Sequence, residues 1–299
     1  LRLAKLAAAA GIPDGVFNVV PGFGETAGQA VGRHMDINCV SFTGSGEVGR
    51  LFLKYAAESN MKRIVLECGG KSPALVMGDV GNLDPVAEQV AAGILFCQGE
   101  NCSAGSRLIV QEQVKDRLLE KLSTQFSGWK VGDPFSPETK VGAMIEEGHL
   151  KKVLSYIDIG KKEGAKIAFG GKRLHESSGG YFVEPTIFDG VTNQMRIARE
   201  EIFGPVLSVI SFKDAEDGVK IANDTSYGLA SSLYTDNINT AHKVAKALRA
   251  GTVSINCYSE GDMAVPFGGF KESGFGGRDK SLLAHDQYAE VKTIWIQLR

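Results

Sequence analysis

The sequence predicts an α/β fold, in which helices pack on the faces of a parallel sheet. Segments with helical periodicity alternate with short apolar segments along the chain. The 37 glycines follow no collagen period, so they indicate many tight turns and close backbone approaches. The apolar fraction of 43% and the charged fraction of 23% are ordinary for a globular protein, and 299 residues can hold two cores.

The first third of the chain shows this alternation most clearly. The predicted helices cover 1–10, 25–33 and 47–59. The predicted strands are Val16–Val20, Cys39–Phe42 and Arg63–Leu66. A helix between two strands is typical of a crossover that joins parallel neighbours, so this region carries the prediction of a parallel sheet.

After residue 70 the same alternation continues with longer elements. The predicted strands are 74–77, 108–110, 166–169, 206–210 and 230–234. The predicted helices are 83–98, 114–126, 147–163, 215–223 and 238–249. Near the end, Val291–Ile296 alternates apolar and polar residues as a strand does. No linker is visible, so we expect a domain boundary at the tight crossing Gly69–Gly70.

Charge and cysteine usage argue against several classes of protein. The chain has 33 Lys and Arg against 35 Asp and Glu, a net charge of −2, which argues against nucleic acid as a partner. No apolar run approaches the roughly 18 residues of a membrane span. The five cysteines include no Cys-x-x-Cys, so we expect neither a disulfide framework nor a metal site, and a cytoplasmic location.

The segment Gly44–Gly49 matches the pattern G-x-G-x-x-G. It follows a predicted strand and opens a predicted helix, where glycines let the backbone approach a pyrophosphate at the helix N-terminus. An acidic residue, Glu67, lies at the end of the next strand, where a standard dinucleotide site would use it to bind the adenosine ribose. The alternative is a strand-to-helix turn that binds no ligand.

Cys102 is the candidate nucleophile among the cysteines. It lies in a turn of polar and small residues between a long predicted helix and a strand, which suits an accessible thiol. A merely structural thiol remains an alternative for it. The other cysteines lie in apolar or strand-like segments and are expected to be small buried hydrophobes; they are Cys39, Cys68, Cys97 and Cys257.

Four motifs together make the chain resemble the aldehyde dehydrogenase superfamily. In chain order they are Leu66–Pro73 (LECGGKSP), Gly99–Arg107 (GENCSAGSR), Glu200–Val206 (EEIFGPV) and Pro266–Gly274 (PFGGFKESG). The resemblance extends to the final predicted strand. It implies the C-terminal part of a Rossmann-like cofactor domain at 1–69, an α/β catalytic domain at 70–270, and a return segment with an oligomerisation strand at 271–299.

The resemblance implies an oxidation of an aldehyde to a carboxylic acid with NAD, with NADP left open. Cys102 would attack the aldehyde, and Glu67 would be the general base near the nicotinamide rather than a ribose ligand. The phosphate contact would fall on Ser45, with Gly44 and Gly49 shaping the turn and the middle glycine not required. The remaining cofactor contacts would be Glu201 on the nicotinamide ribose, Phe203 beside it, and Lys152 near the adenosine ribose. A solvated helix lysine is the alternative for Lys152.

The resemblance also implies that this chain is the later part of a longer enzyme. The side-chain oxyanion donor and the first cofactor-domain strands would lie upstream of Leu1, so we expect the 299 residues alone to be inactive. Segments 258–263, 276–281 and 290–296 resemble the branch that acts on ω-amino aldehydes, including γ-glutamyl-aminobutyraldehyde. Glu260 and Asp262 would attract a cationic amine there, unless this is an ordinary solvated acidic loop. The final strand would pair with a second subunit in a homodimer or homotetramer.

Two other functions stay open from the residues alone. The first is a cysteine acyl hydrolase or transferase without a cofactor, although no motif places a histidine near Cys102 and the phosphate turn would then be idle. The second is a binding or scaffold protein that has kept the fold, against which the presence of both Cys102 and Glu67 counts.

Overall fold

The strands of the molecule form two main sheets, which are joined by a short buried crossing. In residues 1–259 and 261–299, which the computed structural model describes, there is a seven-stranded sheet, a three-stranded sheet and a two-stranded ribbon. The larger sheet has the order β11-β10-β3-β4-β9-β8-β5. Its strands are β3 (Pro73–Val76), β4 (Arg107–Gln111), β5 (Lys166–Phe169), β8 (Thr186–Asp189), β9 (Val206–Phe212), β10 (Ala230–Tyr234) and β11 (Thr252–Ile255).

The larger sheet is parallel except at its edge, where β5 runs antiparallel to β8. Alternate residues of a strand point to opposite faces, and both faces of this sheet are buried. On one face Val76 and Val110 join the core formed with α4 (Asp84–Leu95) and α5 (Glu112–Gly128). On the other face Leu75 and Ile109 pack with α8 (Ala215–Asn223) and α9 (Ile238–Ala247). The predicted parallel sheet is confirmed.

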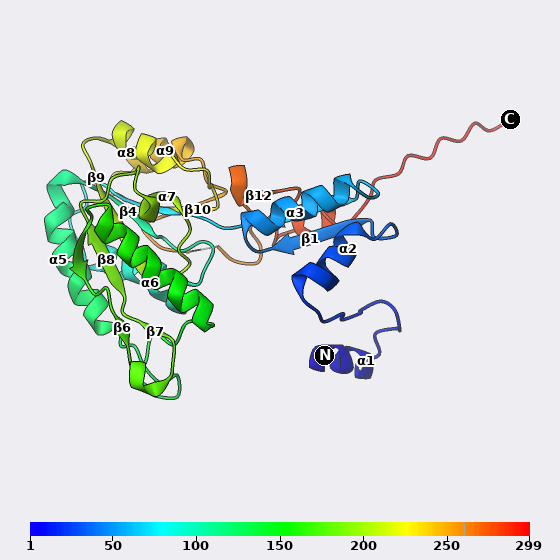
Figure 1. Cartoon of the computed structure of the whole chain (residues 1–299). Coiled ribbons are helices and arrows are strands. Elements are labelled where there is room, and N and C mark those ends of the chain that lie inside the picture. Colours follow the sequence, from blue (N-terminus) through cyan, green and yellow to red (C-terminus); the bar gives the residue numbers. More distant parts are fainter. Residues whose placement is uncertain (260) are drawn as a thin grey trace.

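A third core lies near the antiparallel edge. There α6 (Glu147–Lys162) and α7 (Arg196–Arg199) pack with β8 and β9 through a cluster of aliphatic and aromatic side chains. The ribbon of β6 (Arg173–Leu174) and β7 (Phe182–Val183) lies beyond this edge (Figure 1).

The smaller sheet has the order β1-β2-β12, with β1 (Cys39–Thr43), β2 (Arg63–Glu67) and β12 (Gly274–Phe275). The first two strands are parallel and α3 (Gly46–Ala57) connects them, as predicted. α3 forms because Ser45 caps its N-terminus, accepting the Val48 N–H, and because Phe52 and Ala56 pack on the sheet. Upstream lie α1 (Arg2–Ala9), η1 (Gly24–Gly28) and α2 (Gln29–Arg33).

Residues 68–72 carry the chain from β2 into β3, and all of them are buried. Figure 1 shows the small sheet, with α3 on it, to one side of the larger sheet. The crossing, residues 68–72, therefore lies where the two sheets meet, directly after the carboxyl end of β2. No described helix is long and apolar enough to cross a membrane.

One predicted strand is wrong in this structure, since Val16–Val20 forms turns and extended chain. Residues 289–299, which include the predicted oligomerisation strand Val291–Ile296, form neither helix nor strand in the single chain, so the pairing of this segment with a second subunit stays a prediction. The tail instead runs away from the body of the molecule (Figure 1). A strand exists only through hydrogen bonds to a neighbour, so an alternating pattern alone cannot produce one. The predicted helix 83–98 is also too long, since α4 ends at Leu95.

Several short elements escaped prediction. They are β6, β7, β8, α7, β11, β12 and α10 (Leu283–Asp286). All of these elements have only two to four residues, too few to show either a helical or a strand period.

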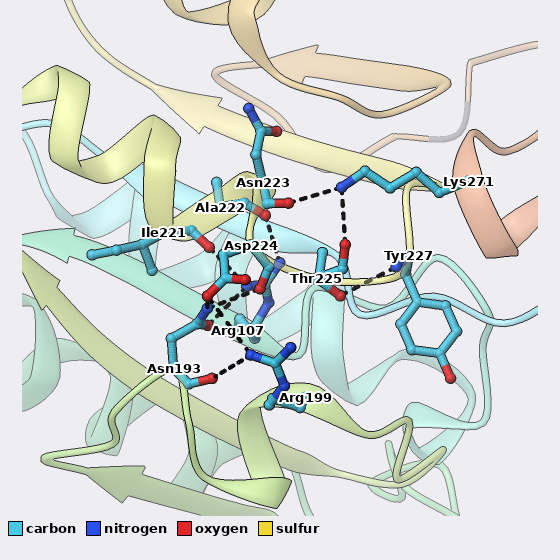
Figure 2. A network of polar contacts seen from close by, with 10 residues as sticks. All are labelled: Arg107, Asn193, Arg199, Ile221, Ala222, Asn223, Asp224, Thr225, Tyr227 and Lys271. Atoms are coloured by element: carbon cyan, nitrogen blue, oxygen red, sulfur yellow. Dashed lines mark hydrogen bonds and ion pairs between the residues drawn. The ribbon is translucent and has the colours of Figure 1, made fainter.

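Arg107, the first residue of β4, is fully buried and acts as a cross-link (Figure 2). Its Nε donates to the Lys71 carbonyl at 2.9 Å, and its two terminal nitrogens donate to Ile221 and Ala222 carbonyls at 3.2 and 2.8 Å and to Asn193 Oδ1 at 3.1 Å. The guanidinium thus joins the crossing to the last turn of α8.

We expect Arg107→Met to destabilise the protein by about 2–4 kcal/mol, because several buried acceptors lose their donors. Urea unfolding followed by circular dichroism measures this loss. The control is Arg117→Met, which removes an exposed arginine from α5 and is expected to change stability by less than about 0.5 kcal/mol. Equal effects of the two substitutions would contradict the cross-linking role.

Candidate active site

A cavity of about 430 Å³ opens where the two sheets meet. This volume lies within the range of roughly 300–1,000 Å³ that is usual for small-molecule sites. Its lining residues are Thr43, Gly44, Ser45, Glu67, Cys68, Gly69, Glu100, Asn101, Cys102, His149, Lys152, Glu201 and Phe203. The structure therefore brings together every predicted site residue except Gly49. Among the described residues no cluster of metal-ligating side chains is found.

The turn before α3 forms one wall of the cavity. Gly44 and Ser45 line it, and the N-terminus of α3 begins directly after them. The Ser45 side chain accepts the Val48 N–H at 3.3 Å, which leaves its own O–H able to donate. A side chain at Gly46 would make only an ordinary contact, 3.5 Å from Arg50, so the middle glycine of the pattern is not needed for space. Gly49 is a buried residue of α3 itself, where a side chain would meet Cys68 Sγ at 3.1 Å.

Cys102 is presented by an unusual turn after α4. Cys97 and Gln98 both have positive φ, 49° and 59°, a conformation that is costly for residues with side chains. The turn is tied down because the Gln98 amide contacts the Ala143 carbonyl and the Gly142 N–H. This reversal sends the chain back to the cavity, where Cys102 is half-buried.

Polar groups surround the thiol. Asn101 Oδ1 lies 3.8 Å from Cys102 Sγ and also accepts the Ser103 N–H at 3.3 Å. Asn101 Nδ2 donates to the Tyr258 hydroxyl at 2.9 Å, which in turn lies 3.1 Å from Ser103 Oγ. The loop that holds Cys102 is thus anchored on both sides by hydrogen bonds, and its position is defined.

Glu67 ends β2 and is buried, with only 6% of its surface exposed. Its Oε2 has no hydrogen-bond partner among the described residues, and its Oε1 lies against Gly268. Burial, with a further contribution from Asp279, raises the pKa of Glu67 from 4.5 to about 7, and Arg278 opposes this rise. A carboxyl group with a pKa near neutrality can both take and give a proton at physiological pH.

Glu201 lies on the opposite wall, against the crossing. Its Oε1 accepts the Gly70 N–H at 3.0 Å. A side chain at Gly69 would come within 2.1 Å of Glu201 Oε2, so only glycine leaves room for this carboxylate. Burial raises the pKa of Glu201, while the Gly70 hydrogen bond, Lys152 and Lys71 oppose the rise.

Phe203 and Lys152 complete this wall. Phe203 has a positive φ of 60°, and its carbonyl oxygen lies 2.5 Å from His149 Nε2. Lys152 is exposed on α6, as a solvated lysine would be, and it also lines the cavity. The Lys152 side chain is therefore accessible to a ligand that binds in the cavity.

Lys71, beside the crossing, is fully buried, and its Nζ has no hydrogen-bond partner among the described residues. Burial, together with the nearby Arg107, lowers the pKa of Lys71 to about 7, while Glu201 and Glu200 oppose the decrease. In its protonated form, Lys71 stabilises the carboxylate of Glu201 electrostatically.

Some neighbours of the site could not be seen in the sequence. His149 looked like one of several scattered histidines, yet it lies in the cavity and faces Glu100 at 3.5 Å. Cys97 was expected to be buried and is exposed, because the left-handed turn points it outwards. Asp279 and Arg278 act on Glu67 from more than 200 residues away. Glu260, in the predicted acidic loop, lies outside the described residues.

The sequence profile of the aldehyde dehydrogenase family matches residues 1–294. The chain belongs to this family. Among curated proteins, the aminoacetaldehyde dehydrogenase of Pseudomonas aeruginosa is 56% identical over 296 residues, which cover 99% of this chain and 59% of that enzyme. This aldehyde dehydrogenase chain therefore spans about three fifths of that relative's length.

Solved structures of the family have the same fold. A mutant of the indole-3-acetaldehyde dehydrogenase AldA of P. syringae, in complex with NAD+ and IAA, superposes with a TM-score of 0.97 at 53% identity, over 99% of this chain and 60% of that one. The γ-glutamyl-γ-aminobutyraldehyde dehydrogenase of Burkholderia cenocepacia gives a TM-score of 0.96 at 50% identity, over 100% and 60%. The predicted aldehyde dehydrogenase-like α/β fold is confirmed.

Proposed function

We propose that the protein oxidises an aldehyde to a carboxylic acid with a nicotinamide cofactor, through a covalent intermediate on Cys102. One observation carries this proposal. Cys102 and Glu67, the thiol and the carboxyl group that the mechanism needs, line one cavity. A raised pKa of about 7 suits Glu67 as a base at physiological pH.

The residues of the cavity fit a dinucleotide. The glycine at Gly69 lets Glu201 approach the crossing, which leaves a carboxylate able to accept hydrogen bonds from a ribose. At the other wall the N-terminus of α3, with Gly44 and Ser45, presents a positive end to a phosphate. We infer that Ser45, Glu201, Phe203 and Lys152 hold NAD, or NADP. The nicotinamide, when bound, supplies the acceptor for the hydride.

The chain's own residues carry the remaining steps. The Cys102 sulfur, as thiolate, bonds to the aldehyde carbon, and the carbonyl electron pair moves to the oxygen. The backbone N–H of Cys102 donates to that oxyanion. After hydride loss the carbon remains on sulfur as a thioester. Glu67 takes a proton from water, the water oxygen bonds to the carbon, the C–S bond breaks, and the thiolate is restored.

We propose that residues 1–69 belong to the cofactor domain, 70–270 to the catalytic domain and 271–299 to a return and subunit-contact segment. The tail supports a homodimer or homotetramer, because Ile294, Trp295 and Ile296 are 73–91% exposed in the single chain. All five cysteines are free, which supports a cytoplasmic location. Size-exclusion chromatography with light scattering tests the assembly.

The test of the function is the formation of NADH, measured by absorbance, when the intact protein is given NAD and a panel of aldehydes. We expect NADH in stoichiometric amounts with carboxylic acid. Hydrolysis of esters without any NADH from aldehydes would favour the cysteine acyl hydrolase instead, with His149, which lines the same cavity, as the candidate base. Binding of NAD without either reaction would favour a scaffold protein.

We propose an ω-amino aldehyde as the substrate. Two of the similar proteins are named for such substrates, aminoacetaldehyde and γ-glutamyl-γ-aminobutyraldehyde, and Asp262 gives the late loop an exposed negative charge. We expect kcat/KM to be about tenfold higher for an amino aldehyde than for a neutral aldehyde of equal length, and Asp262→Asn to reduce this ratio. Equal values for the two aldehydes in the wild-type protein would refute the preference.

We expect Gly69→Ala to weaken NAD binding about tenfold or more, because the new methyl group displaces the Glu201 carboxylate. Isothermal titration calorimetry of NAD into the intact protein measures the change. Gly46→Ala is the matched control, since it adds the same methyl group next to the phosphate turn, where there is space for it. A similar loss in both variants would show that the effect is not specific to Glu201.

A further inference from the structure

Ser273 is fully buried and makes three hydrogen bonds to two separate segments of the chain. Its Oγ donates to the Gly69 carbonyl at 2.7 Å and accepts the Gly228 N–H at 2.9 Å. Its own carbonyl accepts the Cys68 N–H at 2.8 Å. Two of these bonds go to consecutive residues of the crossing between the sheets, directly after Glu67.

The crossing joins the main parts of the proposed active site. The Glu67 carbonyl accepts the Gly44 N–H at 3.0 Å, which ties it to the phosphate turn. The Gly70 N–H donates to Glu201 at 3.0 Å, which ties it to the opposite wall. Between these two points, Cys68 and Gly69 are held by Ser273. Ser273 therefore restrains the backbone of the two residues that directly follow Glu67.

Ser273 also sets the register of β12 against β2. Gly274 pairs with Glu67 in an antiparallel arrangement of only two residues. Gly274 has a φ of 142°, and a side chain there would come within 2.0 Å of the Leu66 carbonyl. A slip of one residue in such a pair turns each side chain to the other face of the sheet. Since this ladder has so few pairs, the hydrogen bonds of Ser273 help to hold β12 in place beside Glu67, whose own strand is paired with β1.

The segment that contains Ser273 is fastened to the C-terminal end of α8. Lys271 Nζ donates to the carbonyls of Asn223 and Thr225 at 2.8 and 2.9 Å, at the C-terminal end of α8 (Figure 2). Helix C-termini carry partial negative charge and favour such a cation. Arg107 joins the same helix end to Lys71, at the far side of the crossing. Both flanks of the crossing are thus fastened to one helix end.

We propose that Ser273 is a positioning residue that holds the crossing, and thereby keeps the Glu67 carboxyl group buried and aimed at the acyl group on Cys102. This inference rests on the proposed function. It assigns to the serine of the Pro266–Gly274 motif a role in the water-dependent step and none in hydride transfer.

The test compares Ser273→Ala with the wild-type intact protein in rapid-mixing kinetics. The fast phase of NADH formation reports attack and hydride transfer, and the steady rate reports thioester hydrolysis. We expect Ser273→Ala to slow hydrolysis by about 10- to 100-fold, the effect of small misplacement of a reacting group, and to change the fast phase by less than about threefold. A wild-type protein without any NADH formation would instead refute the proposed function.

A second readout needs neither cofactor nor substrate. The infrared band of the protonated Glu67 carboxyl group, assigned by its loss in Glu67→Gln, is titrated against pH. The charged groups facing Glu67 are Asp279 and Arg278, and neither is changed. We expect the midpoint in Ser273→Ala to fall towards the ordinary value for glutamate, because the released side chain reaches water.

The matched control is Ser208→Ala. Ser208 is also fully buried, and its hydroxyl donates to the Ile197 carbonyl at 3.1 Å, in a strand of the larger sheet. The Ser208→Ala variant is expected to be less stable than the wild-type protein. It should not change the ratio of the two kinetic phases or the midpoint of the Glu67 titration. If Ser273→Ala does not fold, Ser273→Cys, with a weaker donor of similar size, replaces it. An unchanged phase ratio and midpoint in the folded Ser273 variant would overturn the proposal.

Discussion

Replacing Cys102 by serine is expected to lower the rate of NADH formation from any aldehyde by at least about 10⁴-fold in the intact protein. The substitution removes only the polarisable thiolate, because the oxygen of serine is not ionised at neutral pH. Binding of NAD should be retained, since Cys102 is not among the residues that we infer to hold the cofactor. The measurement pairs NADH absorbance with calorimetric titration of NAD.

Two further observations make this prediction specific to Cys102. Cys97, five residues earlier, is the exposed thiol of the same loop, so Cys97→Ser is the matched control and should keep wild-type turnover. After brief treatment with iodoacetamide, mass spectrometry measures which cysteine is alkylated. We expect the loss of activity to follow the alkylation of Cys102. Activity that survives in Cys102→Ser, or that disappears in Cys97→Ser, would move the nucleophile elsewhere.

The parts of the site that lie close together in the chain could be predicted from the sequence. The turn at Gly44–Gly49 follows a strand and opens a helix, and both elements appear where the periodicity of β1 and α3 places them. Cys102 lies in a polar turn because the residues around it are small and polar. Such local patterns reflect the conformational preferences of the backbone, and in these segments the local preference agrees with the final fold.

The parts that depend on long-range packing could not be predicted. The pKa of Glu67 is set by burial and by Asp279 and Arg278, and no period in the sequence relates these residues. His149 reaches the cavity only because α6 packs beside the Glu200–Val206 segment. Val291–Ile296 has the alternation of a strand but no neighbour in a single chain. In each case the missing information is a tertiary or intermolecular contact.

Replacing Glu67 by glutamine is expected to separate the two halves of the reaction. The amide cannot take a proton from water, so hydrolysis of the Cys102 thioester should fall by about 10²- to 10⁴-fold, the usual contribution of a general base. Attack by Cys102 does not use Glu67 in the proposed mechanism, so a single turnover of NADH should still appear. Rapid mixing followed by acid quench should recover the acyl group on Cys102. Glu272→Gln, an exposed carboxylate in the neighbouring segment, is the control.

The pH dependence gives the same assignment an independent check. The base must be ionised, so the rate of hydrolysis in the wild-type protein should rise with pH and level off above about pH 7, the raised pKa of Glu67.

The stability of the folded protein should change with pH in the opposite direction. The folded protein holds this proton more tightly than the unfolded chain does, so the free energy of unfolding falls as pH rises from about 4.5 to about 7 and stays lower above that. Glu67→Gln, which cannot ionise, should remove this loss. The melting temperature of Glu67→Gln minus that of the wild-type protein should therefore increase between pH 5 and pH 8. If this difference does not change with pH, Glu67 is not the buried group that titrates.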